Sequence, residues 1–318
     1  MGGSWYGLEE LQVQLRMVKK QKQDYLSWWK KWFNIVRGHE NEANQLYAIS
    51  GMAYETSGLW SVSKLIILSY YLPAYLQIVN KHFKKIYYID GCAACGLVKI
   101  NKRLFLGSSL LAERATSIHG NRKFDKIYSI DIDLKNTDVL NKIVDPERTT
   151  VINGDVNEVL PRILEKLDKD PLSHFVCFVD PEGTEVNWST MKRLLESKGD
   201  VIYNYMCSGV ARNINALQSV DRLNMFFGSE DWTKYRDLPE KSENLFNLYL
   251  NNIRNLRKTT VDVKVNSDLA FHYHLIFAFR KSGWEHILND VKEKIESITP
   301  EDLEELLCIY EGKQKTLF

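Results

Sequence analysis

Residues 87–96, YYIDGCAACG, run from aromatic and β-branched residues into an acid and then into a loop of small side chains. Such a change is typical of a strand that ends where the backbone approaches a ligand closely. Cys92 and Cys95, however, stand where a nucleotide-binding loop commonly carries glycine or proline. The stretch therefore allows two interpretations, a cofactor loop or a CxxC metal or redox site.

Length and composition restrict the class of protein. The 318 residues, 44% of them hydrophobic, suffice for one large domain with additions or for two small ones. The net charge of +1 provides no global field towards nucleic acid or anionic membranes. Five cysteines without a preceding signal peptide predict a reduced, cytoplasmic compartment. The longest apolar run, residues 65–72, is shorter than the roughly 20 residues of a membrane span, so we expect no membrane association.

The chain divides into three predicted parts. Residues 1–57 form a helical, Trp-rich extension, residues 58–290 the main domain, and residues 291–318 a C-terminal helix and tail. In the extension, aromatic side chains recur at helical spacing: Tyr25, Trp28, Trp29, Trp32 and Phe33. We expect this aromatic stripe to pack on the main domain, with a partner-binding or base-stacking surface as the alternative. A long amphipathic helix from Ser61, kinked near Pro73, leads into the main domain.

Strand-like and helical stretches alternate in the main domain. Apolar runs occur at residues 85–90, 126–131, 149–154, 174–180 and 200–206, with helical stretches between them. This alternation predicts a parallel sheet with right-handed crossovers. Two further strands, at 261–265 and 271–279, predict a closing β-hairpin. The predicted fold is α/β and Rossmann-like, with a mainly parallel seven-stranded sheet, and it resembles the layout of class I S-adenosylmethionine-dependent methyltransferases.

Ligands of an open α/β sheet bind beyond the carboxyl ends of its strands. At the end of the first strand, the expected cofactor-binding residues are Asp90, Gly91, Cys92, Ala93 and Gly96. Small side chains let the backbone come within hydrogen-bonding distance, and the acid can receive an amine or order a water. A tight strand-to-helix turn without any ligand would have the same sequence.

Acids also end the next two strands. Asp131 and Asp133 follow the second strand, where one carboxylate can accept from both hydroxyls of a ribose. Asp155 and Val156 follow the third strand, where an adenine amino group is commonly held. Asp155 has the alternative role of a helix N-cap.

The fourth strand ends in DPEGTEVNW, residues 180–188. We expect Asp180, Pro181 and Glu182 to be catalytic, because methyltransferases acting on nitrogen place a related D/N-P-P-aromatic turn here. Glu182 and Gly183 depart from that turn, yet the second acid permits proton-accepting chemistry. The alternative is a Pro–Gly turn with a solvated Glu182.

The fifth strand ends near three candidate substrate-binding residues, Asn204, Ser208 and Arg212. Arg212 suits a phosphate, although an exposed surface arginine would look the same. Cys207 is a candidate nucleophile, but its sequence neighbours offer no obvious activating base.

Metal chemistry is the remaining alternative. Cys92 and Cys95 lack a second CxxC or an ordered His/Cys set, so we predict no zinc or iron–sulfur site. A hydrolase or nuclease would instead gather carboxylates around a divalent ion, and the candidates are Asp90, Asp131, Asp133 and Asp180.

Seven segments resemble, in order, the three-Cys-motif partner protein family. They are WSVSKLIILSYYLPAYLQIV, YYIDGCAACG, GSSLLA, INGDVNEVLP, FVDPEGTEVNWSTM, MCSGVARN and YHLIFAF, within roughly residues 58–282. The resemblance implies a class I methyltransferase-like fold, S-adenosylmethionine as cofactor, and a partner whose three-cysteine motif suggests a radical S-adenosylmethionine enzyme. The family loop reads D-L-F-A-G-P-G, so Asp90, Ala93 and Gly96 match. Ala94, where glycine is usual, disfavours a positive φ by about 1 kcal/mol and is expected to weaken cofactor binding.

The chain ends in QKTLF, which resembles peptides that dock on DNA sliding clamps through Gln314, Leu317 and Phe318.

The leading functional prediction is an S-adenosylmethionine-dependent methyltransferase acting on a base of a nucleic acid or nucleotide. The rival prediction is a non-catalytic subunit that serves as a platform for a partner protein or DNA.

Overall fold

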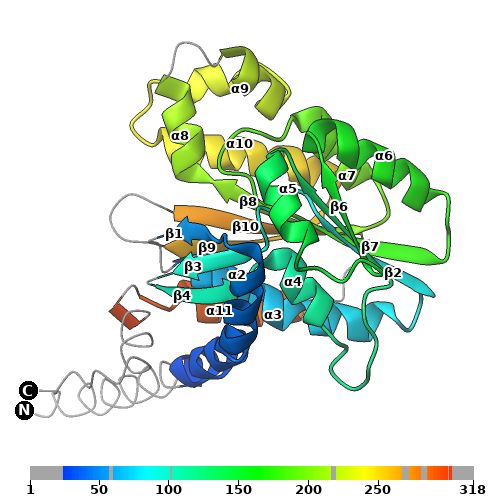
Figure 1. The fold of residues 1–318 in the computed structure, drawn as a ribbon. Coiled ribbons are helices and arrows are strands. Elements are labelled where there is room, and N and C mark those ends of the chain that lie inside the picture. Colours follow the sequence, from blue (N-terminus) through cyan, green and yellow to red (C-terminus); the bar gives the residue numbers. More distant parts are fainter. Residues whose placement is uncertain are drawn as a thin grey trace, which may run out of the picture.

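The computed structural model of the protein describes residues 24–56, 60–100, 102–215, 220–266, 272–280, 285–299 and 301–302. A seven-stranded sheet has the order β6-β5-β2-β7-β8-β10-β9 (Figure 1). Its strands are β2 (Lys85–Asp90), β5 (Lys126–Asp131), β6 (Thr149–Asn153), β7 (Ser173–Val179), β8 (Asp200–Met206), β9 (Thr259–Asn266) and β10 (His272–Phe279). The first five strands in this order, from β6 through β5, β2 and β7 to β8, are parallel. Strand β10 runs antiparallel to both β8 and β9. The predicted fold class is confirmed.

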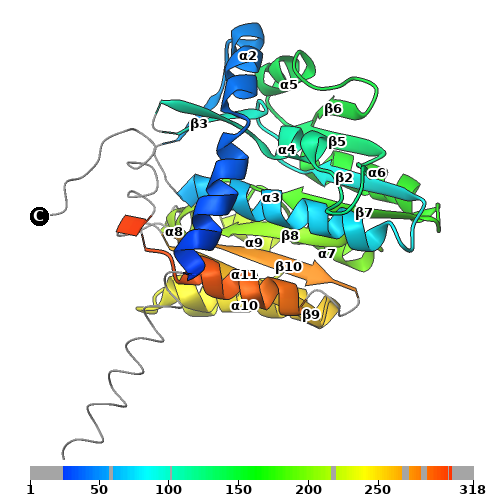
Figure 2. The same ribbon diagram turned by 90° about the horizontal axis from the view of Figure 1, so that it is seen from below.

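Helices cover both faces of the sheet, which explains why its central strands are continuous apolar runs. Every residue of β7 is buried. One buried cluster contains side chains of α3 (Trp60–Val79), α4 (Ser108–Arg114), α5 (Leu134–Asn141) and α11 (Glu285–Glu296). The other contains side chains of α6 (Val156–Asp168), α7 (Trp188–Glu196), α8 (Cys207–Asn215), α9 (Val220–Phe227) and α10 (Lys241–Leu256), and of the 3-10 helix η2 (Asp231–Tyr235). Figure 2 shows α3 and α11 together on the first face.

Helix α3 is the central helix of the first face. Residues Ser61–Val79 are long and apolar enough to cross a membrane by length and composition, but 67% of an 18-residue stretch within them is buried inside the domain. That burial is typical of a core helix. Pro73 lies inside the helix as expected.

The aromatic stripe of the N-terminal segment packs on this first face. Residues 24–37 are helical, and Trp29 and Phe33 are completely buried in the core. The Trp29 indole Nε1 donates to the Lys294 backbone oxygen, in the last turn of α11, at 2.8 Å. The expected docking of the stripe is therefore what the structure shows. Helix α2 (Glu40–Ser50) follows it.

A second, three-stranded sheet was not predicted from the sequence. It consists of β1 (Tyr54–Thr56), β3 (Leu97–Ile100) and β4 (Arg103–Leu106), in the order β1-β3-β4. Strands of three or four residues give too short a pattern for recognition. The β3–β4 hairpin directly follows the small-residue loop, and its ends meet where Gly107 N donates to Gly96 O at 2.7 Å.

Candidate functional site

A cavity of about 840 Å³ lies at the carboxyl ends of the parallel strands. It is lined by most of the predicted site residues: Gly91, Cys92, Ala93, Gly96, Asp131, Asp133, Asp155, Val156, Asp180, Pro181 and Glu182. Four predicted residues, Asp90, Asn204, Ser208 and Arg212, are not among its lining residues.

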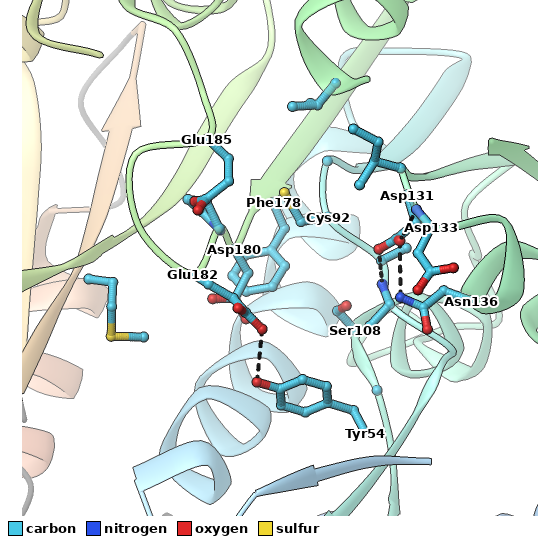
Figure 3. A pocket seen from close by; sticks show the side chains of 18 of the residues that line it. Tyr54, Cys92, Ser108, Asp131, Asp133, Asn136, Phe178, Asp180, Glu182 and Glu185 are labelled. Atoms are coloured by element: carbon cyan, nitrogen blue, oxygen red, sulfur yellow. Dashed lines mark hydrogen bonds between the residues drawn. The ribbon is translucent and has the colours of Figure 1, made fainter. Parts of the chain in front are cut away.

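The cavity has two sides, separated by the end of β2. The Asp131 side, formed by Ala94, Asp131, Asp133 and Asp155, follows β2, β5 and β6. The Glu182 side, formed by Tyr54, Lys64, Asp180 and Glu182, joins the end of β7 to β1 and α3. Figure 3 shows Asp131 and Asp133 on one side and Asp180, Glu182 and Tyr54 on the other, with Cys92 and Phe178 between them.

The small-residue loop is tied to the Asp131 side by its backbone. Ala94 N–H donates to Asp131 Oδ2 at 2.8 Å. Ala94 has a φ of 48° and Gly96 a φ of 81°, so two residues of the loop are left-handed. Alanine in the left-handed region costs on the order of 1 kcal/mol relative to glycine. This is the cost expected above from the family resemblance.

Asp131 is already occupied by donors from the protein. Its Oδ1 accepts from Asp133 N–H and from Asn136 Nδ2, both at 3.0 Å, in addition to the Ala94 bond at Oδ2. A carboxylate offers about four lone-pair positions, so roughly one is left on Oδ2. Asp131 therefore has room for one hydroxyl, rather than for both hydroxyls of a diol.

Asp133 and Ile132 complete this part of the wall. Asp133 caps α5, since its Oδ1 accepts from Lys135 N–H at 2.8 Å, and the residue is otherwise exposed. Ile132, between the two acids, is 74% exposed and lines the cavity. An exposed isoleucine at a cavity wall offers an apolar surface to a ligand.

Asp155 caps a helix and also lines the cavity. Its Oδ1 accepts from Asn157 N–H at 2.8 Å at the start of α6. Asn157 in turn joins this helix to the loop after β7, because its Nδ2 donates to Glu185 O at 2.8 Å and its Oδ1 accepts from Asn187 N–H at 2.8 Å. The N-cap interpretation of Asp155 is thus observed.

Asp90 lies behind the cavity wall. It is completely buried, and its Oδ2 accepts from Ser108 Oγ at 2.5 Å and Ser109 Oγ at 2.7 Å. Its Oδ1 has no hydrogen-bond partner among the described residues. Burial raises the pKa of Asp90 to about 7, although the two serine hydroxyls act in the opposite direction. Asp90 joins the end of β2 to the start of α4.

Asp180 is held by two partners on the Glu182 side. Lys64 Nζ lies 2.7 Å from Asp180 Oδ2, and both side chains are mostly buried. Asn204 Nδ2 donates to Asp180 Oδ1 at 2.5 Å. Asn204, predicted to bind substrate, is itself completely buried and orients Asp180 instead of lining the cavity.

Glu182 receives a hydrogen bond from the small sheet. Tyr54 OH donates to Glu182 Oε1 at 3.0 Å, so this acid lines the cavity with one oxygen held while its side chain remains exposed (Figure 3). Burial and then the Glu182 charge raise the pKa of Tyr54 to about 12. The phenol therefore keeps its proton and remains a donor throughout the neutral pH range.

The DPEG turn and the CSGVARN segment pack directly on each other. A Cβ added at Gly209 would lie 2.2 Å from Glu182 O, so only glycine permits this approach of α8. Asn213 Nδ2 donates to Thr184 Oγ1 at 2.8 Å. Ser208 is half-buried and Arg212 exposed on the same helix, outside the cavity lining.

The surroundings of the cysteines bear on two alternative roles, a nucleophile at Cys207 and a metal site at Cys92 and Cys95. Cys92 lines the cavity and Cys95 is buried, with its Sγ 3.5 Å from Leu97 O. Burial raises the pKa of Cys207 to about 12, which argues against an activated nucleophile. Among the described residues, neither Cys92 nor Cys95 belongs to a group of three metal-ligating side chains, and neither do the strand-end acids proposed for a hydrolase.

Several cavity residues were missed by the sequence analysis. They are Tyr54, Lys64, Ile132, Asn136, Arg222 and Met225. Only Ile132 had a local signal, an apolar residue between two strand-end acids. With Glu185 included, six carboxylates line the cavity against two basic side chains, Lys64 and Arg222, so the cavity favours cationic or amine-bearing ligands.

No protein-family model matches this chain, and no curated protein matches its sequence. Several solved structures are similar in fold. Protein LPL1258 from Legionella pneumophila, of family DUF519, has a TM-score of 0.47 at 11% identity, over 72% of this chain and 91% of that one. An O-methyltransferase from Bacillus cereus in complex with SAH has a TM-score of 0.33 at 10% identity, over 77% and 99%. Trm1 from Pyrococcus horikoshii with S-adenosyl-L-methionine has a TM-score of 0.34 at 11% sequence identity. That similarity covers 67% of this chain and 53% of Trm1. At these identities the similarity concerns the fold alone.

Proposed function

We propose that this chain is an S-adenosylmethionine-dependent methyltransferase whose acceptor is an amine nitrogen on a base of a nucleic acid or nucleotide. The observation that carries the proposal is one cavity of about 840 Å³ with two carboxylate-bearing sides, at the carboxyl ends of a Rossmann-like sheet. A volume of this size accommodates a nucleoside-type cofactor and a planar acceptor group together.

The Asp131 side fits the cofactor. Asp131 Oδ2 has one lone-pair position left and Asp133 is exposed, so the two acids together suit a ribose diol. Ile132 offers an apolar surface to the adenine ring, while Asp155 and Val156 face its edge. S-adenosylmethionine, when bound, supplies an electrophilic methyl group next to its sulfonium, and the surplus of carboxylates suits that cation.

The Glu182 side suits the acceptor amine. Lys64 and Asn204 hold the Asp180 carboxylate in place, and Tyr54 holds Glu182. Both acids retain lone pairs that can accept from an amine N–H. The contribution of these residues is to align the nitrogen and to take up its proton, which is catalysis by positioning and acid–base chemistry.

The acceptor's phosphates would remain outside the cavity, since six carboxylates line it. A base would therefore enter from a single strand or after flipping out of a duplex. Arg212 is exposed on α8, close in sequence to Gly209 at the DPEG turn, and is proposed to contact a phosphate there.

Calorimetry with S-adenosylmethionine and with its demethylated product tests the cofactor part. We expect one binding site per chain for both compounds. Transfer of a radioactive methyl group to total RNA, to DNA and to free nucleotides then tests the acceptor class. Absence of heat with both compounds would contradict the cofactor assignment, whereas binding without transfer would contradict only the acceptor.

The second candidate is a platform subunit, favoured by the left-handed Ala94 in the cofactor loop. In that case the chain would co-purify stoichiometrically with a partner, such as a three-Cys-motif protein, and would transfer no methyl group alone. The proposed sliding-clamp residues Gln314, Leu317 and Phe318 lie outside the described residues.

A further inference from the structure

A cysteine and two histidines meet on the sheet face that carries α10, away from the cavity lining. The reactive atoms of Cys207, His272 and His274 all lie within 4.8 Å of one another. Cys207 is the first residue of α8, directly after β8, and the histidines lie on the neighbouring β10. Because side chains alternate along a strand, His272 and His274 project from the same face.

The environment of His274 points to a missing ligand. His274 is 3% exposed, and neither ring nitrogen has a hydrogen-bond partner among the described residues. Its ring stacks on Phe246 of α10 at a centroid distance of 3.6 Å. A buried imidazole whose ring nitrogens make no hydrogen bond is unfavourable, so a bound group that accepts its lone pair would remove that penalty.

A carboxylate is placed behind His274. Asp262 Oδ2 lies 3.8 Å from His274 Nδ1, and Lys292 Nζ and Arg254 Nη2 lie 3.7 Å and 3.3 Å from the Asp262 carboxylate. In metal sites, a ligating histidine commonly turns its second nitrogen to such a carboxylate. This arrangement leaves Nε2 of His274 as the metal-binding atom.

We propose that Cys207, His272 and His274 bind one divalent transition-metal ion, with zinc as the favoured metal. One thiolate and two imidazoles are the ligand types that zinc prefers. On binding, the Cys207 thiol loses its proton to solvent and the sulfur becomes an anionic ligand. The fourth position is taken by water. Lys264, paired with His274 on β9, is a positive charge near the site that disfavours binding of a cation.

The metal would join the start of α8 to β10. Helix α8 packs with α9, and α9 carries Arg222 and Met225 at the cavity. Bound there, the metal would fix the start of α8, and with it the helices on the Glu182 side, to the sheet. The site does not depend on the proposed methyltransferase activity.

Metal binding is tested on the full chain after removal of any histidine tag and after dialysis against a chelator. Titration with zinc against a chromophoric chelator should show one equivalent bound per chain. Titration with cobalt should produce thiolate-to-cobalt charge-transfer absorption, which requires a cysteine ligand. Absence of both signals in the wild-type chain would overturn the proposal.

Variants identify the ligands. Cys207→Ser should lose the charge-transfer band, and His272→Ala, at a half-exposed position, should weaken zinc binding roughly 100-fold while the chain stays folded. Asp262→Asn should weaken zinc roughly tenfold and keep the band. The controls Cys92→Ser and His119→Ala should bind like the wild type. A band that disappears in Cys92→Ser, or zinc affinity unchanged in His272→Ala, would refute this ligand set.

Discussion

The two sides of the cavity are built in different ways. The Asp131 side consists of residues that directly follow neighbouring parallel strands, and its bonds are short in sequence or run to backbone N–H groups. The Glu182 side consists of side chains brought together from 116 and 128 positions apart, Lys64 with Asp180 and Tyr54 with Glu182. The first side depends on the sheet and on the segments that directly follow its strands, whereas the second requires the N-terminal elements to be packed on it.

The largest effect is expected from Asp131→Ala. The change removes the acceptor of Ala94 N–H, Asp133 N–H and Asn136, and with it the proposed hydroxyl contact. Since hydrogen bonds to a charged group contribute about 1.5–3 kcal/mol, the Kd for S-adenosylmethionine should rise on the order of 100-fold. Calorimetry measures this, with Asp138→Ala, at an exposed position of the following helix α5, as control. Equal affinities of the two variants would contradict the assignment of the Asp131 side.

Asp90→Asn tests the role of the buried acid that lies behind the cavity wall, next to the Asp131 side. Because the folded pKa of Asp90 is raised to about 7, its contribution to stability is full below pH of about 4 and is lost as pH rises through 7. The asparagine variant should lose this dependence, on the order of 2 kcal/mol between pH 5 and 8.

Urea unfolding at several pH values measures the difference between the wild type and Asp90→Asn. Buried Asp200, with a pKa also raised to about 7 by burial, keeps a residual slope in both proteins. Asp138→Asn is the exposed control and should leave the profile as it is. Parallel profiles of wild type and Asp90→Asn would show that Asp90 titrates normally.

Lys64→Met separates the two sides. Without the ammonium group, Asp180 keeps only Asn204 as a partner among the bonds described above, so its orientation is less defined. Methyl transfer should fall about tenfold, while the Kd for the cofactor stays within roughly threefold. Lys192→Met, on the exposed surface of α7, is the matched control. A parallel loss of cofactor affinity in Lys64→Met would mean that the sides are not independent.

The smallest effect concerns the loop. Ala94→Gly relieves the left-handed alanine and should stabilise the fold by about 0.5–1 kcal/mol, whereas Ala93→Gly, at a position without a positive φ, should destabilise it by a similar amount. Thermal unfolding of the two variants shows whether each change raises or lowers the stability of the fold. Destabilisation by both changes would show that the Ala94 conformation carries no strain.

The contrast between the sides also explains what could be predicted from the sequence. KIYSID and HFVCFVD are strand-like runs that end in acids, so the strands, the mainly parallel sheet and the Asp131 side follow from local patterns and the rules of parallel sheets. Lys64 lies in an apolar helix and Tyr54 in a three-residue strand, and neither position carries a local signal of its partner. The placement of Asn204 behind Asp180 likewise depends on which face of β8 packs against the neighbouring strand end.

The closed base of the β3–β4 hairpin has an evolutionary consequence. Because Gly96 and Gly107 are hydrogen-bonded to each other, the chain leaves the small-residue loop and returns to it at the same point. The hairpin contributes Leu97 and Val98 to the cavity and pairs with the strand that carries Tyr54. Relatives could thus exchange or lengthen this ten-residue hairpin, and with it the acceptor they recognise, without altering the residues proposed to hold the cofactor.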